Sequence, residues 1–379
     1  MKRKALFSIL AVQFLFFSLC GCAKTAELGD RLIIEALGID TDETGYTVTV
    51  QALDTGAGGS GEGRSSAETT KIYNFFGSSA AEALSSAAAR TGLEPFYSHA
   101  RFLILGKDAA EKDAAEILDF FLRRRSVRAD ILIAAAEGKA ADVVCADVAD
   151  GISDASAIER ELLIGNENGE NTVMRFFRFA DMLFSEDETA YCPVISVRNS
   201  AYGEKKEVRI VGTAFFDNEK MIFTADKELS AAVLLLTGAA GKMTFRAQGN
   251  NGKYLLNTVK CDTKIKPSFA DGGMFFEIDT RLVCDISEFS GKASNIISQS
   301  DTADAESAAR KLISEKENRA LETLFRKNGC DICRFCRRTL LYRPGFYDEY
   351  KSSPGALTDY SVNVSVKIRR TGREIIEND

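Results

Sequence analysis

The sequence has 379 residues, of which 45% are hydrophobic, so it can fill the cores of two or three folded domains. Its formal charge of −7 becomes about −10 without the first 22 residues, which include three basic residues and no acid. An acidic protein of this kind is a poor partner for nucleic acid and for anionic lipid, which excludes most nucleic-acid-binding functions.

The first 22 residues have the pattern of a lipoprotein signal peptide. Three basic residues precede an apolar run over 6–19, which is shorter than the roughly 20 apolar residues of a spanning helix. The following Leu19-Cys20-Gly21-Cys22 predicts cleavage between Gly21 and Cys22. The Cys22 sulfur would carry a diacylglycerol and its amine an acyl chain such as palmitate, and two or more chains give stable anchoring. We therefore expect residues 1–21 to be removed and the mature protein to be tethered outside the cytoplasmic membrane, the alternative being an ordinary secreted protein.

Residues 22–140 are predicted to form an N-terminal α/β domain. Residues 33–40 and 46–52 have the pattern of two strands of a hairpin. Ser79, followed by Glu82, predicts a capping box at the start of a helix. Continuous apolar strands, which are typical of a sheet covered by helices on both faces, are predicted at 102–105 and 131–134.

Residues 141–203 give a weaker signal and are predicted to form a small middle domain or a bridge. Helices are expected over 156–163 and 174–184, with a polar loop over 165–171 between them. A strand is expected to begin at Tyr191.

Residues 204–379 are predicted to form a C-terminal α+β domain. Apolar and polar residues alternate over 276–284 and 360–369, which indicates strands with one buried face, and a long helix is expected over 301–327. We expect an antiparallel sheet with one wet face and helices on the other. The whole chain is thus predicted to be a multi-domain α+β protein with mixed or antiparallel sheets flanked by helices.

Two candidate sites have weak support from their surroundings. Residues 56–61 match the dinucleotide-binding pattern G-x-G-x-x-G, but the loop continues where a helix would have to begin, so a flexible loop is favoured. His99 is the only histidine and could act as a general base, but no motif partner accompanies it and a structural role is favoured.

The cysteines are a third candidate. Seven follow Cys22, and an odd number cannot all pair within one chain, so we expect mostly buried free thiols. Cys330, Cys333 and Cys336 are spaced like metal ligands and are weak candidates for a metal or redox site. Incidental thiols are the favoured interpretation, and no resident metal or cofactor is expected.

A basic cluster lies at the end of the helix predicted around 114–121. It consists of Arg123, Arg124, Arg125 and Arg128. Cations at a helix C-terminus suit the helix dipole, so a solvated face is the simple interpretation, and contact with an acidic partner surface is the alternative.

The order of these features resembles the Ger(x)C family, the lipoprotein subunit of spore germinant receptors, over almost the full length. Besides the lipoprotein site at Cys22, the resemblance rests on four stretches and a closing strand, whose sequences are ALGID with YTVTVQ (36–51), SHARFLILG (98–106), DFFLRR (119–124), IVGTAFF (210–216) and VSVKIRRTG (364–372). Around Asp331 the chain departs from the family's glycine-containing turn, which weakens any family-wide role for the cysteines.

The resemblance implies a three-domain α+β lipoprotein on the outer face of the inner spore membrane. It would work with an A-type subunit and a multi-spanning B-type subunit in sensing nutrients, and it would not be an enzyme. A free-standing ligand-binding lipoprotein is the first alternative. A tethered thiol or metal protein using Cys330, Cys333 and Cys336 is the second.

Overall fold

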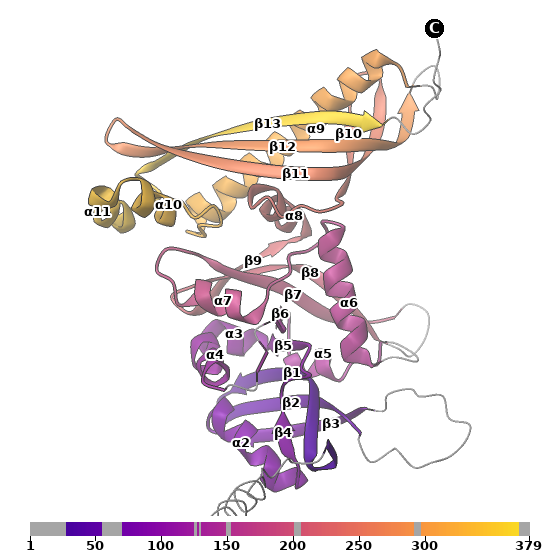
Figure 1. Cartoon of the computed structure of the whole chain (residues 1–379), viewed down its shortest axis with the longest axis vertical. Coiled ribbons are helices and arrows are strands. Elements are labelled where there is room, and N and C mark those ends of the chain that lie inside the picture. The colour runs from indigo at the N-terminus through magenta and orange to yellow at the C-terminus, as the bar shows by residue number, and fades with distance from the viewer. Residues whose placement is uncertain are drawn as a thin grey trace, which may run out of the picture.

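A computed structural model of the chain describes residues 28–54, 70–124, 127–128, 130–148, 153–200, 206–291 and 297–370. Within these residues the strands form two sheets, which follow one another along the long axis of the molecule (Figure 1). Helices flank both sheets, and the sheets are of mixed strand direction. The predicted class, a multi-domain α+β protein with mixed sheets, is confirmed.

The first sheet has nine strands. They are β1 (Arg31–Asp42), β2 (Gly45–Leu53), β3 (Thr70–Gly77), β4 (Glu94–Phe96), β5 (Phe102–Leu105), β6 (Leu132–Ala136), β7 (Ala190–Asn199), β8 (Lys206–Asp217) and β9 (Lys220–Asp226). Their order is β3-β2-β1-β5-β6-β7-β8-β9, with β4 beside β1. The central strands from β1 through β5 and β6 to β7 are parallel, and the outer pairs are antiparallel.

Helices cover both faces of this sheet, as the continuous apolar strands predict. Successive residues of β5 alternate between two cores, with Leu103 in one and Ile104 in the other. The first core is closed by α2 (Ala80–Thr91), α3 (Lys107–Lys112), α4 (Ala114–Leu122) and α7 (Phe176–Leu183). The second is closed by α5 (Ala140–Val144) and α6 (Asp154–Glu167). The chain enters the sheet through a short 3-10 turn, η1 (Leu28–Asp30).

The predicted hairpin and helix start are confirmed in this part. β1 and β2 pair antiparallel, from Asp42 opposite Gly45 at the turn. Ser79 caps α2 by accepting a hydrogen bond from the N–H of Glu82 at 3.1 Å. The Glu82 carboxylate, however, binds the N–H of Ser78 at 2.8 Å instead of that of Ser79, so the reciprocal bond of a capping box forms one residue earlier.

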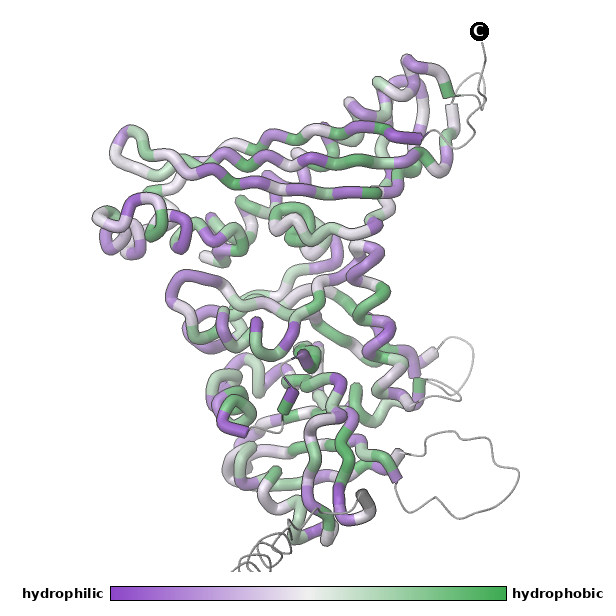
Figure 2. Tube along the Cα trace, in the orientation of Figure 1, coloured by the Kyte–Doolittle hydropathy of each residue, from purple (hydrophilic) through white to green (hydrophobic). Residues whose placement is uncertain are grey.

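The second sheet has the order β10-β11-β12-β13. Its part of the chain contains α8 (Lys227–Leu236), β10 (Thr244–Gln248), β11 (Gly252–Ala270), β12 (Gly273–Gly291), α9 (Gln299–Ala320), a π-helical turn η3 (Leu321–Lys327), α10 (Phe335–Tyr342), η4 (Pro344–Phe346), α11 (Tyr347–Ser352) and β13 (Thr358–Arg370). Figure 2 shows polar and apolar residues alternating along its strands, and the apolar face packs on the helices.

The direction of the last strand corrects the sequence-based prediction. β13 pairs with β12 in parallel, from Thr358 opposite Met274, so this sheet is mixed and not antiparallel. Strand alternation is the same in both arrangements, and direction depends on the connection. Here α9 carries the chain back along the sheet, and a helical crossover of this kind joins parallel strands.

The predicted domain boundaries at 140 and 203 fall within the first sheet. β7, from the predicted middle segment, pairs with β6 before it and with β8 after it. The two sheets also share a core, in which Phe215 of β8 packs with Val233 of α8 and Phe276 of β12. The folded units therefore meet through a continuous sheet and a common apolar core.

The predicted polar loop over 165–171 begins later than expected, because its first three residues belong to a helix and only 168–171 are non-helical. α6 runs to Glu167 and includes Gly165, which the sequence pattern assigns to a loop. A Cβ at Gly165 would lie 1.9 Å from the Oδ1 atom of Asn171, so this glycine is required by packing and not by a turn.

Candidate functional site

The predicted lipid-attachment and cleavage residues, Cys22 and Gly21, lie outside the described residues, as does the glycine-rich loop at 56–61. The described chain begins at Leu28, in the 3-10 turn η1 that leads into β1. In the ranges given above, no helix combines the length and the apolar character needed to cross a membrane.

Residues of the family-like stretches hold the fold together. Both oxygens of the Asp40 carboxylate accept N–H groups at the start of α5, from Ala140 at 2.8 Å and Ala141 at 3.0 Å. A Cβ at Gly106 would lie 2.0 Å from Asp40 Oδ1, so Gly106 makes room for this cap. Burial raises the pKa of Asp40, against the effect of the two N–H groups, which lower it. The role of Asp40 is therefore to join α5 to β1.

The stretch at 210–216 has a similar structural role. Thr213 is fully buried, donates to Ser230 Oγ at 2.8 Å and lies 3.0 Å from Thr172 Oγ1. A Cβ at Gly212 would lie 1.8 Å from the carbonyl oxygen of Ala225, so β8 can approach β9 closely only with glycine there. These contacts tie β8 to β9 and α8, where the two sheets meet.

The arginines of the basic cluster contact nearby residues of the same chain segment. Arg123 pairs with Asp119 at 2.7 Å, and the Arg124 guanidinium lies 4.7 Å from the centre of the Phe120 ring. Arg125 lies outside the described residues. Exposed pairs of this type contribute little to stability, typically about 0–1 kcal/mol, so they leave the cluster available for a partner. Contact with a partner stays a prediction.

Arg128 and His99 line one small cavity. Arg128 donates to both carboxylate oxygens of Asp130, at 2.9 and 2.6 Å. The cavity of about 260 Å³ is also lined by Arg101 and Arg175. His99 is exposed, and its ring lies 5.8 Å from that of Phe96, so its structural role stays a prediction.

The cysteine segment is a structural turn. Cys330, Cys333 and Cys336 are buried, and burial raises the pKa of Cys330 and Cys336 to about 12 and that of Cys333 well above its ordinary value. Such thiols stay protonated and are poor nucleophiles. Among the described residues, no group of three or more histidine, cysteine and acidic side chains is placed to hold a metal.

Asp331 connects this turn to α10 and to the loop before β7. Its carboxylate accepts the N–H groups of Phe335 and Cys336, both at 2.8 Å, at the start of α10. Its own N–H donates to Thr189 Oγ1 at 2.7 Å, in the loop before β7. Burial raises the pKa of Asp331 to about 6. The turn therefore connects the helices of the second sheet to the first sheet.

An acidic loop, Glu186 to Glu188, completes this connection. The side chain of Glu188 is only 6% exposed and forms ion pairs with Arg178, with Arg334 at 3.5 Å and with Arg337 at 3.6 Å. Glu186 and Asp187 contact α11 through Lys351 and Tyr347. The sequence analysis did not predict this contact between the 186–188 loop and the helices of the second sheet, which we call the joint. The available signal was the opposite charge of an acidic run at 186–188 and a basic run at 334–338.

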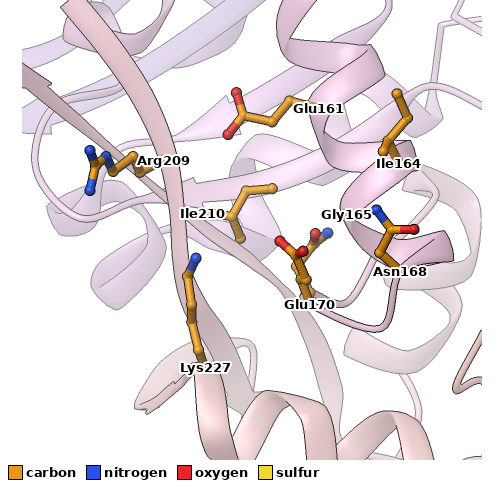
Figure 3. A pocket seen from close by; sticks show the side chains of 9 residues that line it. Glu161, Ile164, Gly165, Asn168, Glu170, Arg209, Ile210 and Lys227 are labelled. Atoms are coloured by element: carbon orange, nitrogen blue, oxygen red, sulfur yellow. The ribbon is translucent and has the colours of Figure 1, made fainter. Parts of the chain in front are cut away.

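A charged cavity of about 570 Å³ lies between α6, β8 and α8 (Figure 3). Its walls come from α6, the loop after α6, β8 and the start of α8, and its charged residues are Glu161, Glu170, Arg209 and Lys227. Figure 3 shows Glu161 and Lys227 on opposite sides of Ile210. Desolvation raises the pKa of Glu161, while Lys227 and Arg209 act to lower it and Glu170 to raise it. None of these side chains was singled out from the sequence.

Comparison with known proteins identifies the family. Residues 24–197 match the family described as "Spore germination protein N-terminal domain", and residues 211–372 match "Spore germination B3/ GerAC like, C-terminal". Spore germination protein GerQC of Bacillus cereus is 26% identical over 331 residues, which cover 86% of this chain and 87% of that protein. Spore germination protein KC of Bacillus subtilis is 30% identical over 126 residues, covering 32% of this chain and 30% of that protein.

A solved structure supports the fold. The crystal structure of the GerBC protein is similar with a TM-score of 0.56 and 16% identity, covering 88% of this chain and 96% of that one. The family matches support a role in spore germination and confirm the resemblance found in the sequence. The chain belongs to the Ger(x)C family of spore germination proteins.

Proposed function

We propose that this chain is the lipid-anchored, non-catalytic C-type subunit of a nutrient germinant receptor. It would lie on the outer face of the inner spore membrane, beside integral A-type and B-type subunits. The observation that carries the proposal is that the two family matches, to residues 24–197 and 211–372, cover most of the chain after the lipoprotein site at Cys22, and the first begins two positions after it. Residues of the family-like stretches and the buried thiols have structural roles, which supports a binding subunit over an enzyme.

The anchor gives such a subunit its mode of action. Leu28 lies six residue steps after Cys22, and an extended chain spans at most about 3.4 Å per residue, so the folded part would begin within roughly 20 Å of the bilayer. Confinement next to the membrane raises the effective concentration of the domains around integral partners. Weak contacts, such as those of Arg123 and Arg124, could then hold a complex together.

The experiment is a pull-down from spore inner membranes in mild detergent, with wild type compared to Cys22→Ala and, as a matched control, Cys20→Ala. We expect wild type and Cys20→Ala to stay in the membrane and to recover multi-spanning subunits. Cys22→Ala should be released, and nutrient-triggered germination should be lost. Membrane retention of Cys22→Ala would contradict the anchor, and recovery of the lipoprotein alone from well-extracted membranes would favour a free-standing binding protein.

A further inference from the structure

The charged cavity between α6, β8 and α8 gathers three charged groups that interact electrostatically across it but form no ion pair in the described parts of the chain. The carboxylates of Glu161 and Glu170 and the ammonium of Lys227 line it without an ion pair or a side-chain hydrogen bond there. The fourth charged residue, Arg209, donates to Glu207 at 3.1 and 2.6 Å. Two carboxylates and one ammonium therefore face a common space, with a net negative charge.

Helix stability does not explain the position of Lys227. It is the first residue of α8, where the positive end of the helix dipole disfavours a cation. Asp226 already caps this helix by accepting the N–H of Leu229 at 2.9 Å. An unpaired cation at this position therefore stabilises neither the helix nor an ion pair in the described residues, and its charge is available to a ligand.

A buried amide supplies a further acceptor at the cavity wall. Asn171 is 1% exposed, and its Nδ2 group donates to the carbonyl oxygens of Leu162 at 3.1 Å and Thr172 at 3.0 Å. These two bonds fix the amide so that Oδ1 lies on the side of Gly165, which also lines the cavity. Among the described residues Oδ1 has no hydrogen-bond donor. A buried acceptor without a donor is unfavourable, and a ligand N–H group would satisfy it.

We propose that this cavity binds a free basic amino acid, with the ligand carboxylate at Lys227 and its amino groups at the acidic wall. The wall offers acceptors at Glu161, Glu170 and Asn171 Oδ1, which suit a ligand rich in N–H donors. One carboxylate and two ammonium groups, as in lysine, match one ammonium and two carboxylates in number and in sign. The volume of about 570 Å³ is in the range of small-molecule sites and holds such a ligand with water. The inference is independent of the receptor assignment.

The test is calorimetric titration of the mature lipoprotein in detergent with L-lysine. Two analogues each remove one feature, since norleucine lacks the side-chain amine and cadaverine lacks the carboxylate. The variants are Lys227→Met and Glu170→Gln, with Lys220→Met, an exposed lysine on β9, as the matched control. Lys227 and Glu170 are exposed, so circular dichroism is expected to show an unchanged fold for both variants.

We expect saturable binding of L-lysine that weakens about tenfold or more for each analogue and for each cavity variant, because each change removes one charge-assisted contact. Lys220→Met should bind like wild type. Absence of saturable binding to wild type would overturn the assignment of the site. Equal affinity for norleucine would overturn the basic class of ligand, and unchanged affinity in Lys227→Met would overturn the placement of its carboxylate.

Discussion

A buried glutamate in the long helix α9 provides a strong test of the energetics. Glu317 is fully buried, and one carboxylate oxygen accepts the hydroxyl of Thr280 at 2.8 Å. The other oxygen has no hydrogen-bond donor among the described residues. Burial raises the pKa of Glu317 from 4.5 to about 7, because the charged form loses its hydration. The protonated side chain therefore suits this site better than the carboxylate.

The sign of the effect on stability follows from proton binding. Between pH 4.5 and pH 7 the folded protein holds a proton on Glu317 that the unfolded chain has released, so the free energy of unfolding falls as pH rises. At about 1.4 kcal/mol per pKa unit, the difference between 4.5 and 7 corresponds to about 3 kcal/mol. Glu317→Gln keeps the shape without the charge, so the variant should match wild type near pH 4.5 and be about 3 kcal/mol more stable at pH 8.

The measurement is urea unfolding of the unlipidated protein at pH values from 4.5 to 8, with wild type and Glu317→Gln compared at each. Glu315→Gln, an exposed substitution on the same helix, is the control and should show a constant difference near zero across this range. The reasoning would be refuted if the difference between Glu317→Gln and wild type stayed constant with pH. A variant that became less stable as pH rose would refute it as well.

Two further substitutions test the packing of the joint and of the cavity wall. Glu188→Gln should lower the free energy of unfolding, measured in urea, by about 1–3 kcal/mol, because it removes the charge that three arginines surround. Glu186→Gln removes a charge from an exposed pair and should change this free energy by less than about 0.5 kcal/mol. Equal effects would contradict the role given to burial. Gly165→Ala should cost about 1–3 kcal/mol because its Cβ would meet Asn171, while Gly138→Ala, which meets open space, serves as the control; a tolerated Gly165→Ala would show that the wall adjusts.

Local signals made much of the fold predictable. The alternation in residues 46–52 placed a strand, although Thr49 and Gln51 on its polar face are buried too, and the apolar run at 102–105 placed a strand covered on both faces. The start of α2 was equally readable, since the Ser79 side chain accepts a free N–H group of the first turn. These features depend on residues close in sequence, so they can be read from one amino-acid sequence.

Features that depend on distant residues were not predictable. Alternation is the same in parallel and antiparallel strands, so the direction of β13 could not be read from it. Gly165 was assigned to a loop because nothing in the sequence shows that Asn171 lies against it. Lys227 and Glu161 are 66 positions apart, and only the approach of α8 to α6 brings them to one cavity. Ordinary charged residues without a motif carry no local sign of such a site.

The position of β1 has a mechanical consequence. The chain enters the fold through η1 into β1, which lies inside the sheet between β2 and β5 and not at its edge. A force that pulls on Leu28 along the strand would load the hydrogen bonds to both neighbours in shear, all at once. An edge strand pulled across its axis would instead release its bonds one by one. A tether on this strand could therefore transmit tension into the centre of the sheet without peeling the fold open.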